Sequence, residues 1–309
     1  MFNSSIVPMP QDIMKFIYIK ENIYKWVFSI LAFASLTFLI SITIILFKEG
    51  LPIFNKINLL DFLFGKRWYP TLEPKEFGIL PLILGSFWVT LGALFICVPL
   101  GVGSALFLNE MAGMRVKLIL KPIIEILAAI PSIVYGFFGM ILVAPFLQRL
   151  LNIPVGQTAF TGSLMLGIMA TPTVCSIAED ALSFVPKSFR EASFAVGANR
   201  WQTLIKVILP AAGSGISTAI ILGMSRAIGE TMTVLMCTGG AAVIPKSFFQ
   251  PVRPMTSTIA AEMGEAVFGS SHYHALFAIA LVLFLITLVF NIIAELVSRR
   301  FRIKLGLGR

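Results

Sequence analysis

Six apolar stretches set the main constraint on this chain, because each is long enough to cross a lipid bilayer. They cover residues 26–47, 77–108, 126–147, 155–178, 211–238 and 275–294. A helix needs about 20 mainly apolar residues to span a hydrocarbon core of roughly 30 Å. Composition agrees, since 57% of the 309 residues are hydrophobic, only 13% are charged, and the mean hydropathy is +0.91. The predicted fold class is therefore an all-α integral membrane protein with six transmembrane helices.

The first stretch is predicted to be a retained helix and not a cleaved signal peptide. Its apolar part is 22 residues long, it begins after residue 25, and no clear small-x-small cleavage site follows it. Cys97, Cys175 and Cys237 each fall inside an apolar stretch. Their positions predict packing roles, with neither a disulfide nor a metal site.

Basic residues lie between and beyond the apolar stretches and not on one polar face. With six crossings, both termini lie on one side of the membrane. That side collects 15 basic residues against 8 on the other, and Arg226 is the remaining one of the 24. Cytoplasmic loops are enriched in Lys and Arg, so both termini are predicted to be cytoplasmic. The net charge of +9 then requires no nucleic-acid partner.

The domain organisation is predicted to be simple, because no internal repeat or low-complexity tract divides the chain. We expect a cytoplasmic N-terminal segment over residues 1–25 and one transmembrane domain over residues 26–298. A basic cytoplasmic tail over residues 299–309 would follow.

An elbow over residues 179–210 is the most informative of the predicted cytoplasmic segments. Two pairs in it match the capping box, in which an N-cap residue and the residue three positions later bond each other's backbone N–H groups; they are Ser188 with Glu191 and Asn199 with Gln202. The first pair predicts a helix over residues 189–196, ended by Gly197 because glycine readily takes the left-handed conformation. The second pair predicts a helix from Arg200 toward Leu209.

The first elbow helix is predicted to dock against another protein, because a helix of about eight residues is marginal alone in water. Spacings of three and four place a docking face on Phe189, Ala192, Ser193 and Val196. The alternative is an amphipathic linker that rests on lipid headgroups.

The elbow sequence "EASFAVGANRWQTLIKVILP" resembles the cytoplasmic signature of ABC-importer permeases, which runs Glu-Ala-Ala, three residues, Gly, nine residues, Ile-x-Leu-Pro. The positions that match in register are Glu191, Ala192, Gly197, Leu209 and Pro210. Ser193 and Val207 replace an alanine and an isoleucine of the signature. In that family the segment is a coupling helix that docks on the ATP-hydrolysing subunit. The resemblance therefore implies a type I, MetI-like importer permease fold and adds Glu191 and Gly197 to the docking residues.

Four other segments resemble the PstC-type permease subunit of phosphate importers: "PLILGSFWVTLGALFICVPLGVGSALFLNE", "LAAIPSIVYGFFG", "SRAIGETMTVLM" and "TSTIAAEMGEAVFGSSHYHALFAIALVLFLITLVFN". This resemblance implies a complex in a bacterial or archaeal inner membrane that moves inorganic phosphate by alternating access. The implied partners are a PstA-type second permease, PstB-type ATPase subunits and an extracytoplasmic PstS-type phosphate-binding protein. ATP and Mg would belong to the ATPase, because no G-x-x-x-x-G-K-[ST] occurs here. The chain itself is expected to be a non-catalytic subunit without a bound cofactor.

The fifth apolar stretch contains two charges, Arg226 and Glu230, within "LGMSRAIGETMTVLM". As one helix from residue 211 to the Gly239-Gly240 break, it would hold both side chains on one face, one turn apart and close enough to pair. An arginine at the bilayer centre costs about 2.5–3.5 kcal/mol even on the mild insertion scale, and it normally faces a cavity or a partner. Mutual neutralisation that only fixes helix packing is the alternative to a functional role.

An anion permease needs a cation on its path, and a guanidinium can bond two oxygens of an oxyanion at once. We therefore predict that Arg226, Glu230 and Thr231 act in substrate translocation. Glu230 could accept the O–H that phosphate keeps near neutral pH and that sulfate lacks, or it could be a tether that releases Arg226 in only one conformational state. Path-lining hydroxyls are predicted at Ser132, Tyr135, Thr171 and Thr173, for which accommodating helix kinks is the alternative.

The remaining polar residues of the membrane edges suggest no further site. Glu125, Glu262 and Glu265 are expected to be solvated or capping, and His272 and His274 to mark the membrane interface, with no metal bound. Two other functions stay open: a permease for another oxyanion such as sulfate or molybdate, and an intramembrane enzyme or sensor that uses Arg226 and Glu230. The coupling signature argues against the second, because such an enzyme would not need to dock an ATPase.

Overall fold

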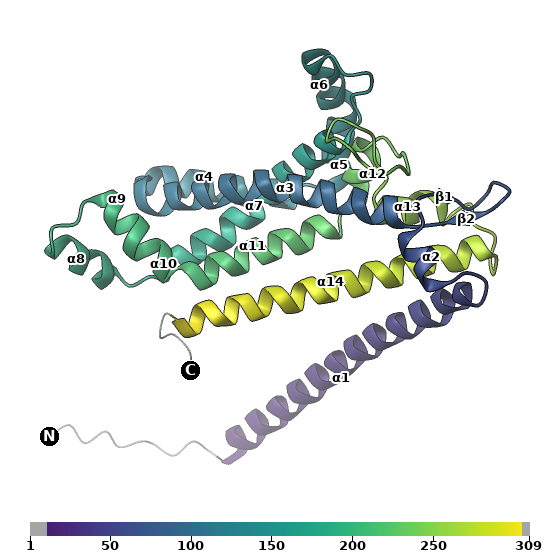
Figure 1. The fold of residues 1–309 in the computed structure, drawn as a ribbon. Coiled ribbons are helices and arrows are strands. Elements are labelled where there is room, and N and C mark those ends of the chain that lie inside the picture. The colour runs from purple at the N-terminus through teal and green to yellow at the C-terminus, as the bar shows by residue number, and fades with distance from the viewer. Residues whose placement is uncertain (1–10, 305–309) are drawn as a thin grey trace, which may run out of the picture. The chain divides into compact units, whose positions relative to one another are not determined.

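The computed structural model describes residues 11–304, and almost all of their regular structure is helical (Figure 1). They form two compact units, one ending at Glu49 and one beginning at Gly50. The described part of the first unit is one long helix, α1 (Gln11–Gly50), whose last residue is counted with the second unit. The helix begins inside the predicted N-terminal segment. The rest of that segment, residues 1–10, and residues 305–309 of the predicted tail lie outside the described residues.

The second unit begins with short elements and continues with long helices. The short elements are η1 (Leu51–Asn55), α2 (Leu59–Phe64) and an antiparallel hairpin of β1 (Trp68–Tyr69) and β2 (Glu76–Phe77), in which Trp68 pairs with Phe77. The long helices are α3 (Leu80–Leu106), α4 (Met114–Ala129), α7 (Ala159–Ser183), α11 (Gly213–Ile228) and α14 (Ser271–Lys304). The shorter helices are α5 (Ser132–Phe138), α6 (Ala144–Leu151), α8 (Lys187–Ala195), α9 (Arg200–Thr203), α10 (Leu209–Ala211), α12 (Met232–Cys237) and α13 (Met255–Glu262).

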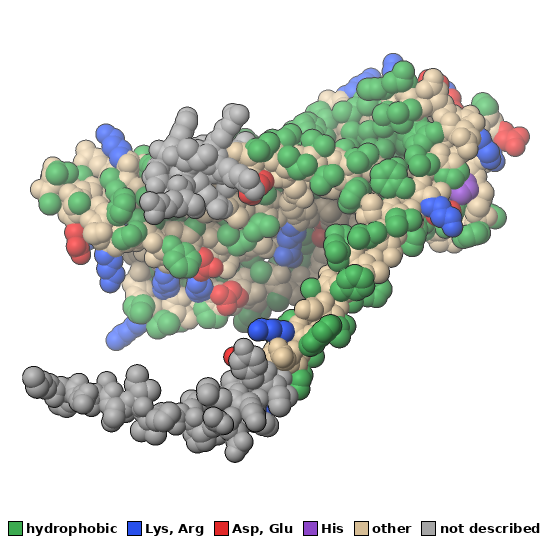
Figure 2. Space-filling view, turned by 90° about the horizontal axis from the view of Figure 1, so that it is seen from below, with side chains coloured by type: hydrophobic (Ala, Val, Ile, Leu, Met, Phe, Trp, Pro, Cys, Tyr) green, Lys and Arg blue, Asp and Glu red, His purple; other side chains and the backbone are tan. Residues whose placement is uncertain are grey.

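The described residues contain five stretches that are long and apolar enough to cross a membrane. They are Lys20–Asn55, Leu80–Met111, Ser132–Leu151, Ala159–Ser183 and Ser271–Leu296. A sixth results if Arg200–Ala211 and Gly213–Ile228, which meet at a bend of 69°, are one broken span. Figure 2 shows hydrophobic side chains over much of one face, with charged side chains gathered mainly toward the ends. This distribution is typical of a membrane protein.

The centre of the second unit is formed by α3, α7 and α11. α3 packs along α7, and α11 packs against both. Buried apolar residues from all three helices meet in one cluster that includes Cys97, Val174 and Ala219. A Cβ added to Gly223 would lie 2.5 Å from a methyl of Val174, so this glycine lets α11 approach α7 closely. Cys97, Cys175 and Cys237 are buried free thiols, as expected for packing residues.

Two of the predicted membrane stretches are broken. The expected continuous helix over residues 126–147 is wrong, because α4 ends at Ala129 and α5 begins at Ser132. Ile130 and Pro131 between them are extended, with ψ of 129° and 139°. Pro131 lacks an N–H and keeps the preceding residue out of the helical region, which accounts for the break.

The expected single helix from residue 211 to the Gly239-Gly240 break is also wrong. α11 ends at Ile228 and α12 begins at Met232, so the residues between them interrupt the helix. Gly229 is the C-cap of α11, and glycine favours helix ends over helix interiors. Arg226 therefore lies in the last turn of α11, and Glu230 lies in the break itself.

The elbow forms two helices, as predicted, with one difference at its start. The capping box of Asn199 and Gln202 is confirmed, with both bonds present at 2.8 and 2.9 Å. Gly197 follows α8 with φ of +85°, the left-handed conformation predicted for it. The Ser188 box is wrong, because α8 begins at Lys187, directly after Pro186. A proline there pre-sets φ and supplies the start signal that Ser188 was expected to give.

Three π turns interrupt the helices of the second unit, namely η2 (Phe107–Met111), η3 (Gly139–Val143) and η4 (Leu204–Ile208). η3 precedes Pro145 and η4 precedes Pro210. A proline ring clashes with the carbonyl four residues back, and widening the turn relieves that clash. η2 has no proline within the ten residues that follow it.

Buried charges hold the two ends of the second unit. At the end that carries the elbow, the Glu179 side chain is 2% exposed, and its two oxygens form ion pairs with Lys117 Nζ at 2.5 Å and with Lys121 Nζ at 2.6 Å. Lys121 also pairs with Asp180 at 3.0 Å. The hydrogen bonds to Glu179 and Asp180 raise the pKa of Lys121 above its usual value, so this lysine stays charged. The cluster ties α4 to α7.

At the end that carries the hairpin, Glu262 is the shared acceptor. Its side chain is 14% exposed and pairs with Arg253 at 2.5 Å and with His272 at 2.9 Å. The indole N–H of Trp68 donates to the same carboxylate at 3.0 Å. The expectation of a solvated or capping Glu262 is therefore corrected, whereas Glu125 and Glu265 are exposed as expected. Local sequence gave no sign of these partners, because Trp68 is 194 residues from Glu262, and Arg253 and His272 are 9 and 10 residues away, outside α13.

Glu179→Ala should destabilise the protein, because it leaves Lys117 and Lys121 without their shared buried carboxylate. We expect the free energy of unfolding to fall by about 3–5 kcal/mol. Thermal unfolding of the purified protein in detergent would measure the loss as a lower melting temperature. Asp180→Ala is the matched control: this side chain is 55% exposed and pairs with Lys121 alone, so a change within about 0.5 kcal/mol is expected. Equal losses in both variants would contradict the prediction.

Candidate functional site

Two helix breaks meet in the second unit, and the candidate site lies where they meet. One separates α4 from α5, and the other separates α11 from α12. α12 packs against α5 (Figure 1), and the hydroxyl of buried Thr233 donates to the carbonyl of Ser132 at 2.9 Å. Breaks leave backbone donors and acceptors without partners inside a helix. Polar side chains are therefore needed here.

Arg226 lies at the end of α11 and reaches two neutral acceptors. Its NH1 donates to the Thr173 hydroxyl of α7 at 3.1 Å, and its NH2 donates to the carbonyl of Ala128 at 3.4 Å. Ala128 is in the last turn of α4, where carbonyls lack partners within the helix and the helix dipole is negative. The cation is thus stabilised by the C-terminal end of another helix.

Glu230 lies in the second break and bonds the start of α12. Its Oε1 accepts the backbone N–H of Met232 at 3.1 Å and that of Thr233 at 3.3 Å. Its backbone carbonyl accepts the hydroxyl of Thr256, from α13, at 2.8 Å. A carboxylate is favourable at a helix N-terminus because of the free N–H groups and the positive end of the dipole.

The expected pairing of Arg226 with Glu230 is not found within residues 11–304. The one-turn spacing applies to a continuous helix, and the break after Ile228 removes it. Each charge is satisfied by a different helix end instead. A guanidinium carries more N–H donors than the two bonds of Arg226 use, and neither bond goes to a carboxylate. Arg226 therefore retains donors for an anion.

The other predicted path residues are placed differently. Thr173 contacts Arg226 directly. The Tyr135 hydroxyl donates to the carbonyl of Leu127 at 2.9 Å, beside the α4 end that Arg226 bonds. Thr171 bonds back to its own helix at Gly167, so its hydroxyl does not join the group. Thr231 lies in the second break and makes a long 3.4 Å bond to the carbonyl of Gly229.

Sequence reasoning missed three contributors to the site: the Ala128 carbonyl, Thr233 and Thr256. Alanine has no polar side chain to signal its role, but Pro131 three residues later marks a helix end whose carbonyls need donors. Thr233 looks like an ordinary small residue of an apolar stretch, and Thr256 like one of the segment between two such stretches. Their partners are 101 and 26 residues away along the chain, beyond the reach of any local pattern.

The elbow residues predicted to dock a partner are mostly exposed. Phe189 is 48% exposed and Val196 is 84% exposed, and Glu191, Ala192 and Gly197 are also exposed. Ser193 differs, because its side chain is buried and its hydroxyl bonds that of Thr203 at 2.9 Å. Ser193 thus ties α8 to α9. Two further aromatic side chains nearby, Phe184 and Trp201, are 83% and 61% exposed.

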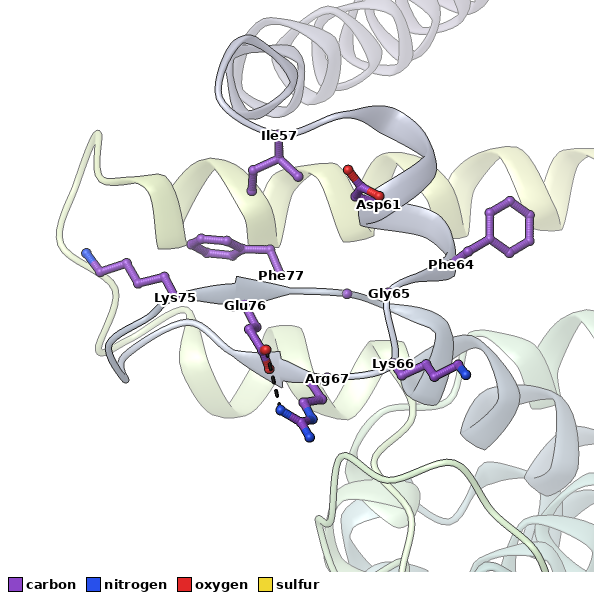
Figure 3. Close-up of a pocket in the computed structure, with 10 residues that line it drawn as sticks. Ile57, Asp61, Phe64, Gly65, Lys66, Arg67, Lys75, Glu76 and Phe77 are labelled. Carbon is purple, nitrogen blue, oxygen red and sulfur yellow. Dashed lines mark ion pairs between the residues drawn. The ribbon is translucent and has the colours of Figure 1, made fainter.

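A separate open pocket of about 480 Å³ lies at the hairpin end (Figure 3). Its lining carries both acids and bases, including Asp61, Lys66 and Lys75. Arg67 at its wall already pairs with Glu76 at 3.6 Å, as the dashed line in Figure 3 marks. No residue predicted to act on a substrate lines it, and its mixed charge does not favour an anion. In the described part of the chain, no three metal-binding side chains gather at one place.

Comparison with known proteins places the chain among importer permeases. Residues 97–303 match the family described as "Binding-protein-dependent transport system inner membrane component". The probable ABC transporter permease protein YqgH of Bacillus subtilis is 39% identical over 263 residues, 84% of this chain and 85% of that protein. The phosphate transport system permease protein PstC of Haemophilus influenzae is 35% identical over 256 residues, 76% of this chain and 80% of that protein.

Solved structures show the same fold at low sequence identity. A chain of the MetNI methionine ABC transporter, crystallised in an inward-facing conformation, aligns with a TM-score of 0.54 and 20% identity. The alignment covers 72% of this chain and 94% of that one. A chain of a bacterial alginate ABC transporter, solved with its alginate-bound periplasmic protein, aligns with a TM-score of 0.64 and 14% identity, covering 91% and 96%. The predicted type I, MetI-like permease fold is confirmed.

Thr233→Val should loosen the contact between the two breaks. The change preserves shape but removes the hydroxyl that bonds the Ser132 carbonyl, so the free energy of unfolding should fall by about 1–3 kcal/mol. Thermal unfolding in detergent measures it. Thr231→Val is the matched control, because its hydroxyl makes only a 3.4 Å bond within its own turn, and we expect a change within about 0.5 kcal/mol. If Thr231→Val lowered the free energy of unfolding as much as Thr233→Val, the bond between Thr233 and Ser132 would not be the cause of the loss.

Proposed function

Because this chain belongs to the family of binding-protein-dependent transport system inner membrane components, we propose that it is the permease subunit through which an ABC importer moves inorganic phosphate. Its relatives are named permeases, and the family is one of non-catalytic subunits. Support for phosphate comes from the PstC proteins of Haemophilus influenzae and Mesorhizobium japonicum, named for phosphate transport, the latter 33% identical over 265 residues. The observation that carries the proposal is that Arg226 lies at two helix breaks and has no carboxylate partner among residues 11–304.

The proposed orientation places the elbow and both termini in the cytoplasm of a bacterial or archaeal cell. The count of basic residues supports it, since 15 fall on the elbow side and 8 on the other. The exposed side chains of Phe189 and Val196 would then dock on a PstB-type ATPase, which uses ATP and Mg. A PstA-type permease and an extracytoplasmic PstS-type binding protein would complete the complex. This chain holds neither nucleotide nor cofactor on this proposal.

Arg226 would bind the oxyanion at the meeting of the two breaks. Its bonds to Thr173 and Ala128 go to neutral oxygens, and the second is long at 3.4 Å. An arriving oxyanion would displace these weak bonds without breaking a buried ion pair, which would cost several kcal/mol. Two broken helices can shift at their breaks with little loss of regular hydrogen bonding. Substrate sites in transporters commonly use such discontinuous helices, and alternating access would expose Arg226 to each side in turn.

Glu230 would select the protonated oxyanion. Its Oε1 bonds the start of α12, but its Oε2 accepts no hydrogen bond from the described residues. Phosphate near neutral pH keeps an O–H that can donate to this oxygen. Sulfate has no such proton and would be repelled by the carboxylate. Thr231, in the same break, would add a hydroxyl to the path.

Arg226→Gln should abolish most uptake, because it removes the proposed anion-binding cation while keeping a polar side chain that can donate hydrogen bonds. Hydrogen bonds to charged groups contribute about 1.5–3 kcal/mol, so we expect uptake to fall about 10- to 100-fold. The measurement is ATP-driven uptake of labelled phosphate by the complete complex in proteoliposomes. Arg149→Gln, at an exposed arginine of α6, is the control and should transport normally. Undiminished uptake by Arg226→Gln would remove this residue from the mechanism.

Glu230→Gln tests selectivity separately from folding. The amide keeps an oxygen that can accept the N–H groups of α12, but it removes the negative charge that would repel sulfate. We expect the preference for phosphate over sulfate to fall about tenfold, which corresponds to about 1.4 kcal/mol. Competition of sulfate with phosphate uptake in proteoliposomes measures it. Retained transport with unchanged selectivity would contradict the discriminating role and favour a tether.

A further inference from the structure

Arg190 connects the elbow helix α8 to a distant part of the chain. Its side chain is 22% exposed, and its guanidinium makes a forked contact with the carboxylate of Glu110. Nε lies 3.2 and 3.3 Å from the two carboxylate oxygens, and NH2 also donates to Oε1. NH1 donates to the carbonyl of Val185 at 3.0 Å. Forked arginine–carboxylate contacts are strong and fix geometry as well as distance.

Glu110 belongs to η2, the π turn that continues α3 at the elbow end (Figure 1). Its side chain is 18% exposed and accepts a further bond from the Asn109 amide at 3.0 Å. Glu110 and Arg190 are 80 residues apart in the sequence. The contact therefore joins α8 to the end of a core helix.

The π turn that carries Glu110 has no local cause of the kind found in the other two. η3 and η4 each precede a proline, whereas η2 does not. A π turn holds one extra residue and so turns the residues in it toward a new direction, and such turns are frequent at functional sites. The π turn η2 contains Glu110, whose carboxylate pairs with Arg190.

Besides the chain connection that joins it to α7, α8 is attached to the core along two routes through side-chain contacts. One runs through the Ser193–Thr203 bond into α9 and on to α11, which carries Arg226. The other runs through Glu110 into α3, which packs along α7, the helix whose Thr173 bonds Arg226. Both routes end at the same guanidinium.

We propose that the Arg190–Glu110 pair is a coupling strut, which transmits displacement of α8 to α3 while the elbow transmits it to α11. The proposal rests on the proposed function, in which an ATPase moves α8. With the strut, α3 and α11 move together around Arg226. Without it, α8 pivots on the elbow alone, and ATP is hydrolysed with less substrate moved. Arg190 and Glu110 are positioning residues, since neither touches substrate.

The test is the number of phosphate ions taken up per ATP hydrolysed by the complete complex in proteoliposomes. Glu110→Gln and Arg190→Gln should each lower this ratio at least fivefold while most ATPase activity remains. The double variant should be no worse than either single variant, because all three lack the same contact. Arg115→Gln is the matched control, since it removes an exposed arginine five residues from Glu110 and should leave the ratio unchanged.

A merely structural role would lower ATPase activity and uptake together and leave the ratio unchanged, and that result would overturn the strut. So would a double variant whose loss is the product of the single losses. If Arg190→Gln fails to assemble, Glu110→Gln decides, because it leaves α8 intact. A parent complex that moves another oxyanion but no phosphate would overturn the proposed substrate instead, and the same ratio measured with that oxyanion would then test the strut.

Discussion

Backbone groups at a helix end need partners, and inside a bilayer no water supplies them. The candidate site of this protein is built where two such ends meet. Arg226 donates to the carbonyl of Ala128 at the end of α4, and Glu230 accepts two N–H groups at the start of α12. An unsatisfied buried group costs about 1–3 kcal/mol, and a central arginine about 2.5–3.5 kcal/mol. The two costs are of similar size. A contact between a charged side chain and a helix end therefore reduces both costs at once.

This arrangement explains how a cation and an anion can remain four residues apart without pairing. A direct ion pair would leave both helix ends without partners and would also occupy the guanidinium. Satisfied by neutral oxygens, Arg226 keeps the capacity to bind an anion, and on the proposed function that anion is the substrate. The break between α11 and α12 is therefore as much a part of the site as the charged side chains are.

Much of the fold could be predicted from the sequence, because crossing a bilayer imposes a length and a composition that local patterns reveal. The elbow was also readable, since the Asn199–Gln202 box and Gly197 act within a few residues. The break at Pro131 had a local signal that the apolar run obscured. The Glu179 cluster had none, because its lysines lie about 60 positions away on another helix. Contacts of that kind depend on how α4 packs on α7, which no short pattern records.

Buried charges in the second unit have two kinds of partner. Some form ion pairs with opposite charges, and Arg226 bonds only neutral oxygens among the described residues. Glu179 at one end is shared by two lysines, Lys117 and Lys121. Glu262 at the other end is shared by Arg253 and His272. Removing one member of such a buried group costs about 3–5 kcal/mol, so these clusters fix the helices they join. Arg226 has no carboxylate partner among the described residues, and its two bonds go to neutral oxygens at 3.1 and 3.4 Å. Paired charges therefore stand where helices must be held together, and on the proposed function the cation that has no carboxylate partner among the described residues stands where the substrate oxyanion binds and leaves.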